Sequence, residues 1–198
     1  PIKGTRPRGR TPAADRQLRR ELVESEKDTA ELAMIVDLLR NDLGKVCRFG
    51  SVRVVDPAAI ESWPTVFHRT ATIEGALADG ATRADLLRAT LPGGSITGCP
   101  KRRAMQIIEE LEPVSRGIYC GAIGAIGLAG GLQLNVAIRT MVCRGREVFV
   151  HAGGAITSDS TPEAEYAELL TKAQAMLQAL GATGADEAKP RTVAQAHA

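Results

Sequence analysis

The hydrophobic and polar positions of the chain follow two periods, one helical and one typical of strands. Apolar residues three and four positions apart, together with capping residues before the first turn, predict helices. In the helix that opens after Ser25, the predicted buried stripe consists of Leu32, Ile35, Val36 and Leu39. The predicted helices cover residues 12–23, 25–41, 81–91, 102–111 and a last segment that begins at Pro162.

Alternating apolar residues predict strands at 50–55, 66–73, 117–128, 132–142 and 147–151. Glycine-containing hairpin turns separate the last strands of this series, so we expect an antiparallel meander. In its middle strand Arg139 shares a face with small neighbours, and a partly buried arginine there needs an anionic partner, either protein or ligand. Tyr119 is the only tyrosine among these strands, and a place in the core explains it equally well.

A glycine-rich segment, residues 92–101, leads into the fourth predicted helix. Such a turn presents backbone N–H groups and the positive end of a helix dipole to an anion, and Ser95 and Thr97 add hydroxyl groups. Its glycine spacing approaches that of a nucleotide-binding P-loop, but Cys99 and Pro100 stand where the lysine and the hydroxyl residue are required. We therefore expect a carboxylate here rather than a nucleotide, while noting that such turns are common without any ligand.

Composition and charge narrow the class of protein. Hydrophobic residues make up 44% of the 198 residues and charged residues 24%, as in an ordinary globular protein, and a net charge of +2 does not favour nucleic acid. Arg6, Arg8 and Arg10 form a basic loop without interleaved aromatic residues, which favours a solvated loop, or one folded over an anionic ligand, over a nucleic-acid arm.

Several signals are missing from the sequence. No apolar run approaches the ~20 residues of a membrane span and no secretory signal is present, so we expect a cytoplasmic location. The four cysteines have no C-x-x-C spacing, which indicates buried free thiols rather than a disulfide frame or a zinc site. The composition of residues 181–198 predicts a disordered tail.

Two predicted helices carry acidic residues at helical spacing, Asp28 with Glu31 and Glu165 with Glu168, and Lys172 shares the face of the second pair. The opposite side of that last helix carries Ala164, Ala167, Leu170 and Leu177. Mg2+ usually binds one or two protein carboxylates plus substrate oxygens and waters, so one carboxylate from each helix would suit it. Three of these acids also have a plain explanation: Asp28 as a helix cap, Glu31 as solvated, and Glu168 as the surface partner of Lys172. Together with the glycine-rich segment, the acids favour a magnesium-assisted reaction on a small polycarboxylate.

Four segments, residues 1–6, 34–42, 92–101 and 164–166, resemble the chorismate-utilising enzymes and occur in the family's order. That family includes anthranilate synthase component I, aminodeoxychorismate synthase component I, isochorismate synthase and salicylate synthase. The resemblance implies the chorismate-binding α+β fold, in which antiparallel sheets pack together with helices outside. Because the chain starts at Pro1 inside a motif, we expect residues 1–180 to be the C-terminal half of the catalytic domain.

The resemblance also implies roles for individual residues. Glu31 and Glu168 would bind magnesium, with Asp28 and Glu165 beside them on the same helix faces. His68 would lie next to the departing C4 oxygen of chorismate, although a histidine in a strand is more commonly structural. Ala155 departs from the glycine often found at its position in the family. The implied substrate-binding residues are Gly4, Thr5, Ser95, Thr97, Tyr119, Arg139, Gly153 and Lys172.

Lys3 distinguishes the branches of the family. Members that make anthranilate resemble Pro-Ile-Ala-Gly-Thr at residues 1–5, whereas those that make aminodeoxychorismate typically carry lysine, as this chain does. The resemblance implies that unprotonated Lys3 attacks C2 of chorismate and that ammonia from a separate glutamine amidotransferase subunit then adds at C4. The product would be 4-amino-4-deoxychorismate, the precursor of p-aminobenzoate in folate biosynthesis.

Alternatives to this interpretation stay open. The nearest is anthranilate synthase component I, with Lys3 an incidental substitution. Another is a non-catalytic module that keeps the fold and holds a carboxylated ligand. Lys3 itself has a plain explanation as a frayed terminal side chain. Because the family's general-acid glutamate lies before the equivalent of Pro1, we expect the 198 residues alone to be inactive.

Overall fold

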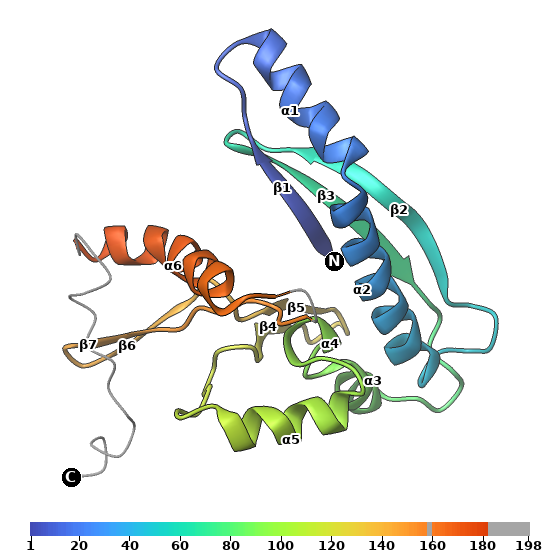
Figure 1. Ribbon diagram of the computed structural model, residues 1–198. Coiled ribbons are helices and arrows are strands. Elements are labelled where there is room, and N and C mark those ends of the chain that lie inside the picture. The colour runs from blue at the N-terminus through green and yellow to red at the C-terminus, as the bar shows by residue number, and fades with distance from the viewer. Residues whose placement is uncertain (158–159, 182–198) are drawn as a thin grey trace. The chain divides into compact units, whose positions relative to one another are not determined.

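The computed structural model of the protein describes residues 1–157 and 160–181 (Figure 1). The chain divides into two compact units, Pro1–Ser95 and Ile96–Ala198, called unit 1 and unit 2 below. Apart from Gly181, the tail predicted to be disordered lies outside the described residues. Within the described part of the chain, no helix combines the length and the apolar character that crossing a membrane requires.

Unit 1 is built on a three-stranded antiparallel sheet with β3 in the centre. Its strands are β1 (Ile2–Pro7), β2 (Arg53–Ser62) and β3 (Val66–Glu74). Thr5 on β1 stands opposite His68 on β3, and the register between these strands is irregular between Ile2 and Thr5. Gly4 lies in that irregularity with a φ of +90°, a conformation that glycine adopts without strain.

The strand predicted at residues 66–73 is confirmed, whereas the strand predicted at 50–55 lies further along the chain. It is β2, which pairs with β3 from Arg53 to Ser62. Pro57 discourages a strand prediction, but β2 is an edge strand and its register with β3 is irregular around this proline. An edge strand tolerates proline. Pairing with β3 therefore extends β2 beyond residue 55, although the sequence there does not alternate between apolar and polar residues.

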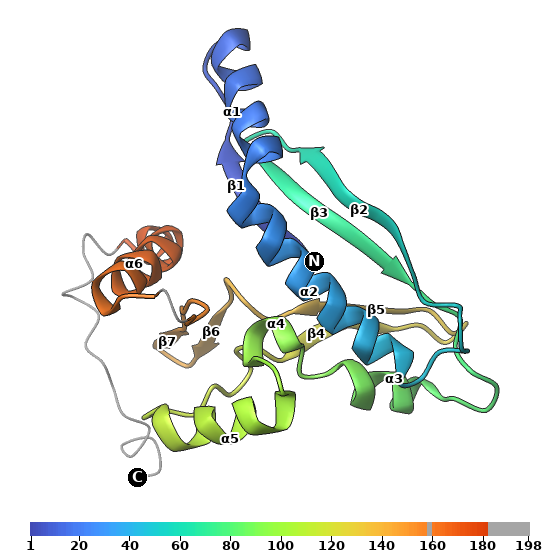
Figure 2. The same cartoon turned by 45° about the vertical axis from the view of Figure 1, so that its right-hand side comes forward.

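Two helices, α1 (Pro12–Glu24) and α2 (Glu26–Gly44), lie along one face of the sheet (Figure 2). Both begin where their caps predict: the side chain of Thr11 accepts from the backbone N–H of Ala14, and that of Ser25 accepts from Asp28. The helix α2 continues beyond the predicted end at Asn41. Its core-facing residues Leu32 and Val36 pack with Ala71 of β3, and Leu39 is only partly buried.

A buried arginine fastens the corner between α1 and α2. Arg69, on β3, is only 8% exposed. Its Nη1 donates to the carbonyl oxygens of Leu22 and Ser25 at 3.4 Å and to Oγ1 of Thr29 at 2.6 Å. These acceptors belong to the end of α1 and the start of α2, so one side chain holds both helices against the central strand. Unit 1 then closes with α3 (Arg83–Thr90), whose predicted cap Thr82 forms a capping box with Asp85.

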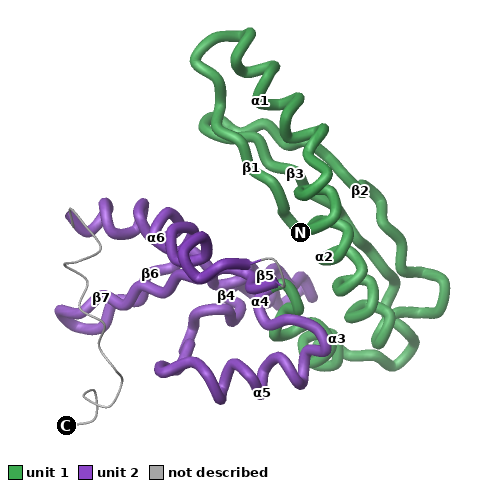
Figure 3. The backbone as a smooth tube through the Cα atoms, in the orientation of Figure 1, with its two compact units in different colours: residues 1–95 green, residues 96–198 purple. Residues whose placement is uncertain are grey.

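Unit 2 contains two antiparallel hairpins and the helices α5 and α6 (Figure 3), and the single turn α4 (Gly94–Thr97) stands at the boundary between the units. The elements are α5 (Lys101–Leu111), β4 (Ala122–Ile126), β5 (Leu132–Val136), β6 (Met141–Arg144), β7 (Glu147–Val150) and α6 (Pro162–Ala179). The predicted turns are confirmed, because β4 pairs with β5 and β6 pairs with β7.

The predicted continuous meander is wrong. In the described residues β5 ends at Val136, β6 starts at Met141, and these two strands belong to different sheets. Between them Ala137 exchanges hydrogen bonds with Cys120 and Gly121, and Arg139 adopts a φ of +52°. Arg139 is therefore an exposed residue of a connection, and its predicted place in the middle of a strand is wrong as well.

The helix after the glycine-rich segment forms as predicted, but its surroundings differ from the expectation. It begins at Lys101, one residue before the predicted start, with Pro100 as its N-cap and no side chain capping that end. The helix is amphipathic in sequence yet buries none of its residues, and Leu111 is 75% exposed. On its apolar face Ala104 and Ile108 are partly buried, whereas Ile107 and Leu111 are exposed, so packing within the described residues covers only part of that face.

The last helix packs through the face that carries its charges. The residues of α6 that are buried are Ala173 and Met176, which share a face with Glu165 and Lys172. On the side predicted to be apolar, Leu170 and Leu177 are partly buried, whereas Ala164 and Ala167 are exposed. The prediction of buried free thiols is confirmed for Cys47 and Cys120, whereas the free thiols of Cys99 and Cys143 are exposed.

Candidate active site

In unit 1, Lys3 and Glu31 form an ion pair between β1 and α2. The Nζ atom of Lys3 lies 3.3 Å from Oε2 of Glu31, and the two side chains are 25% and 36% exposed. Lys27, one turn earlier on α2, lies 3.9 Å from the other oxygen of Glu31. The packing of α2 against β1 thus brings the residue expected to act as nucleophile to the residue expected to bind magnesium.

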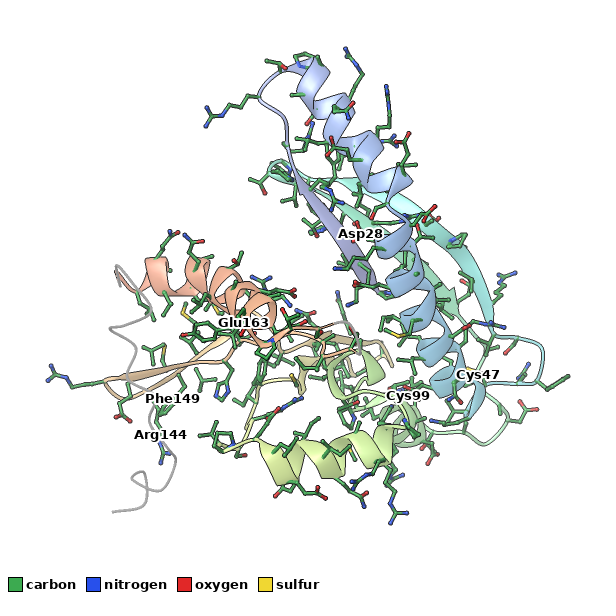
Figure 4. The ribbon with its side chains drawn as sticks, in the orientation of Figure 1. Asp28, Cys47, Cys99, Arg144, Phe149 and Glu163 are labelled. Atoms are coloured by element: carbon green, nitrogen blue, oxygen red, sulfur yellow. The ribbon has the colours of Figure 1, made fainter. Side chains whose placement is uncertain are left out.

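The carboxylate of Asp28 is directed at β1 and does not cap the N-terminus of α2. Its backbone N–H donates to Oγ of Ser25 at 3.2 Å, but its carboxylate accepts from Nη2 of Arg6 at 3.1 Å. Figure 4 shows Asp28 near the start of α2. A Cβ atom on Gly4 would lie 2.9 Å from Cγ of Asp28 and 2.8 Å from Cδ1 of Leu22. Gly4 is therefore required by both its φ and its close contact with the acidic side chain.

His68 hydrogen-bonds to the same strand that carries Lys3. Its Nδ1 lies 2.9 Å from Oγ1 of Thr5, its partner in the β1–β3 register. The imidazole is partly buried, so one ring nitrogen is bonded to a hydroxyl that the resemblance assigns to substrate binding. Unit 1 by itself therefore forms two contacts along β1: Lys3 and Gly4 lie against Glu31 and Asp28 of α2, and Thr5 bonds to His68 of β3.

The sequence-predicted residues Ser95, the last of unit 1, and Thr97, in unit 2, both belong to the single turn α4. Ser95 is exposed and Thr97 is partly buried. Gly94 is buried, and a Cβ atom there would lie 3.2 Å from Cδ1 of Leu38 on α2. Gly94 therefore packs closely against α2, and this contact fixes the backbone directly before Ser95.

In unit 2, three charged groups of α6 converge on one glycine. A Cβ atom built on Gly154 would lie 2.7 Å from Oε2 of Glu165, 3.6 Å from Oε1 of Glu168 and 3.7 Å from Nζ of Lys172. Lys172 forms an ion pair with Glu168 and donates to the carbonyl oxygen of Gly153 at 3.2 Å. The predicted common face of these residues is confirmed, and it is directed at the small-residue segment that follows β7.

The two oxygens of Glu165 have different surroundings. Oε1 accepts from the hydroxyl of Ser160 at 2.5 Å, whereas Oε2 is buried with no hydrogen-bond partner among the described residues. An unpaired buried carboxylate oxygen is costly unless something completes it. This oxygen, next to the carboxylate of Glu168, suits a hard cation such as Mg2+, which prefers carboxylate ligands and water.

Neither pair of acidic residues is joined by a third potential metal ligand within the described residues. Within residues 1–157 and 160–181, no group of three or more His, Cys, Asp or Glu side chains gathers in a way that could hold a metal ion. Asp28 and Glu31 belong to unit 1, and Glu165 and Glu168 belong to unit 2. The donors of each pair fit magnesium chemically, and the joint site expected from the resemblance stays a prediction.

The expected substrate-binding residues of unit 2 are connected by direct contacts. Arg139 donates through Nη1 to the carbonyl oxygen of Lys172 at 2.9 Å, and the amine of Lys172 donates to Gly153. A Cβ atom on Gly153 would lie 3.2 Å from the hydroxyl oxygen of Tyr119. The structure therefore brings Tyr119, Arg139, Gly153 and Lys172 together, although Arg139 arrives from a connection rather than from a strand.

Tyr119 is held by an aromatic stack that the sequence analysis missed. Its ring lies 5.2 Å from that of His151 at an interplanar angle of 22°. The guanidinium of Arg116 lies 6.0 Å from the centroid of the same ring. Burial raises the pKa of the Tyr119 phenol, so its hydroxyl stays a hydrogen-bond donor at neutral pH. No periodic signal pairs residues 119 and 151, because only the fold brings them together.

Antiparallel sheets with helices packed on them confirm the α+β class of fold, and the comparisons with known proteins identify the family. The sequence model described as chorismate binding enzyme matches residues 1–178. The chain is 47% identical over 193 residues to anthranilate synthase component 1 of Haloarcula marismortui, covering 98% of this chain and 38% of that protein. It is 49% identical over 180 residues to aminodeoxychorismate synthase component 1 of Bacillus subtilis, covering 91% and 38%.

Solved structures agree with that assignment. Anthranilate synthase component I of Streptococcus pneumoniae matches with a TM-score of 0.76 and 42% identity, over 82% of this chain and 37% of that one. The menaquinone-specific isochorismate synthase of Escherichia coli matches with a TM-score of 0.77 and 25% identity, over 88% and 40%. The chain belongs to the family of chorismate binding enzymes, and it spans well under half the length of these relatives.

Proposed function

We propose that the protein catalyses a magnesium-dependent amination of chorismate at C4, which yields 4-amino-4-deoxychorismate for p-aminobenzoate and folate biosynthesis. Family membership supports chorismate as the substrate. Relatives of nearly equal identity are named for two products, aminodeoxychorismate and anthranilate. The overall similarity therefore does not choose between these reactions, and the choice depends on individual residues.

The observation that carries the proposal is the position of Lys3. Its amine lies on β1, 3.3 Å from Glu31, and is partly buried rather than frayed at the end of the chain. In the proposed reaction the nitrogen of Lys3 forms a bond to C2 while the C4 hydroxyl departs as water. Ammonia then bonds to C4, and the bond between C2 and Lys3 breaks. An amine paired with a carboxylate is protonated and not nucleophilic, so the ion pair must open before the attack.

Glu31 and Glu168 are the proposed magnesium ligands, with Asp28 and Glu165 beside them. When bound, magnesium would supply positive charge to the ring carboxylate of the substrate. A cation held by Glu31 would compete with Lys3 for the same carboxylate. Cation binding to Glu31 would therefore release Lys3 from its ion pair and leave the lysine amine free.

The unit 2 residues would bind the substrate's carboxylates. Arg139 uses one guanidinium nitrogen on a backbone carbonyl, and a guanidinium offers further N–H donors to an anion. Tyr119 supplies a neutral donor next to the backbone of Gly153. In unit 1, Gly4, Thr5 and His68 would lie near the ring and the departing oxygen. Ser95 and Thr97 add hydroxyl donors from the glycine-rich segment.

A glutamine amidotransferase subunit is the proposed source of ammonia; relatives named as component 1 of aminodeoxychorismate synthase support a separate second component. We expect the 198 residues alone to be inactive, because the matched relatives are much longer. The second candidate is anthranilate synthesis, which relatives named for that product favour.

The test uses the full-length protein with chorismate, Mg2+ and ammonia. Chromatography with mass detection should find aminodeoxychorismate and no pyruvate, and Lys3→Ala should abolish the product. Lys27→Ala is the matched control, since this lysine also lies next to Glu31 but is 84% exposed. Fluorescent anthranilate together with equimolar pyruvate would overturn the proposal in favour of the second candidate.

A further inference from the structure

Ser160 lies just before α6 and has a defined hydrogen-bond direction. Its Oγ accepts from the backbone N–H of Thr157 at 3.0 Å, and its backbone N–H donates to the carbonyl of Thr157 at 3.1 Å. A hydroxyl has a single proton to donate. The carboxylate oxygen Oε1 of Glu165, 2.5 Å away, accepts that proton, so in any bond with the Thr157 hydroxyl, 3.5 Å from Oγ of Ser160, the Thr157 hydroxyl is the donor.

This contact divides the carboxylate of Glu165 into a held and a free oxygen. With Oε1 bound to Ser160, Oε2 points at Gly154 and is buried without a partner among the described residues. A short hydrogen bond to a charged group restricts rotation of the carboxylate, because rotation would break it. Ser160 therefore determines which oxygen faces the space shared with Glu168.

Gly154 keeps that space open. A methyl group at this position would lie 2.7 Å from Oε2 of Glu165, closer than carbon and oxygen atoms approach in folded proteins. The amine of Lys172, 3.7 Å from the same Cβ position, pairs with Glu168 and donates to the carbonyl of Gly153. The region thus has one carboxylate that is charge-paired and one carboxylate oxygen that is oriented but unpaired.

We infer that Ser160 is a positioning residue for divalent-cation binding: it holds Glu165 so that Oε2 faces the cation side, and Gly154 leaves the room to do so. The inference rests on the proposed function, because it assumes that the acids of α6 take part in binding a cation. It adds Ser160 and Gly154 to the residues that determine affinity, neither of which touches substrate in this role. Residues that orient metal-binding groups typically change affinity 10–100-fold when they are mutated.

The experiment measures Mn2+ binding to the full-length protein by electron paramagnetic resonance of the free ion, without substrate or turnover. Ser160→Ala should raise the Kd for Mn2+ about 10-fold, and Ser160→Thr, which keeps the hydroxyl, should restore it. Ser115→Ala is the matched control, because the Ser115 hydroxyl accepts only a 3.4 Å bond from the Gly117 N–H. The unfolding midpoint of each variant is measured in parallel, so that loss of folded protein is recognised.

A double variant separates positioning from a general structural role. Glu165→Gln should weaken Mn2+ binding, and adding Ser160→Ala to it should cause no further loss, because Ser160 acts through Glu165. Gly154→Ala should also weaken binding with the fold intact. Equal Mn2+ affinity of the wild-type protein and Ser160→Ala, or additive losses in the double variant, would overturn the inference. Absence of Mn2+ and Mg2+ binding by the wild-type protein would overturn the magnesium role in the proposed function itself.

Discussion

The candidate site residues of unit 1 and those of unit 2 are held in place in different ways. In unit 1 the residues project from a central sheet and from a long helix packed on it, over a core that includes Leu32, Val36 and Ala71. In unit 2 the corresponding residues lie in connections: Tyr119 before β4, Arg139 between β5 and β6, and Gly153 between β7 and α6. The comparison suggests that residues of unit 1 are positioned by collective packing, whereas those of unit 2 depend on single polar contacts such as Ser160 with Glu165.

The largest expected effect concerns the Lys3–Glu31 pair of unit 1. Lys3→Ala in the full-length protein should lower kcat for aminodeoxychorismate formation on the order of 10³-fold, about 4 kcal/mol of activation free energy, because the attacking group is lost. Lys3→Arg should not restore activity, since it keeps the charge but not a nucleophilic amine. Steady-state kinetics with saturating ammonia tests this. Turnover within a factor of a few of the wild type would remove Lys3 from the mechanism.

The next prediction tests the packing of unit 1. Arg69→Met should lower the free energy of unfolding by about 3 kcal/mol, because the carbonyls of Leu22 and Ser25 and the hydroxyl of Thr29 lose a charged donor. Urea denaturation of the full-length protein measures the change. Arg53→Met is the control, since its ion pair with Glu74 is exposed and should contribute less than about 1 kcal/mol. Equal effects of the two substitutions would contradict the role given to the buried corner.

A substitution on α6 tests whether Mg2+ binding depends on the carboxylate of Glu168 in unit 2. Glu168→Gln should weaken Mg2+ binding about 10–100-fold, measured by calorimetry, with little change in stability, because the side chain is half exposed. Glu163→Gln on the first turn of the same helix (Figure 4) is the matched control and should bind normally. Unchanged affinity and turnover in Glu168→Gln would favour a non-catalytic ligand-binding module.

The smallest expected effect is a pH dependence at the start of α1. Two hydrogen bonds from Arg8 and one from the backbone N–H of Gly9 lower the pKa of Asp15 to about 2. A carboxylate with a lowered folded-state pKa stabilises the protein above its unfolded pKa of about 4, and this contribution is lost as the pH falls from about 4 to 2. Circular dichroism of urea unfolding between pH 2 and 5 should show a weaker pH dependence in Asp15→Asn. An identical pH profile would contradict the contribution of this carboxylate.

The candidate site was partly predictable, and particular residues show where the limit falls. Glu165, Glu168 and Lys172 are three and seven positions apart, so helical geometry alone places them on one face. Lys3 was identified by a motif, but its distance from Glu31 depends on how α2 packs on β1. His151 and Ser160 gave no signal, because stacking on Tyr119 and bonding to Glu165 join residues that no periodic pattern relates.

The sequence by itself determined the starts of α1, α2, α3 and α6, since Thr11, Ser25, Thr82 and Thr161 each cap a backbone N–H three residues ahead. It also determined the hairpin turns and, through short motifs, the family. Only the tertiary structure decided that the chain turns out of the strand at Arg139, that the charged face of α6 is the packed one, and that Arg69 holds two helices. Caps and turns depend on neighbours a few residues apart, whereas burial and side-chain partners depend on segments that only folding brings together.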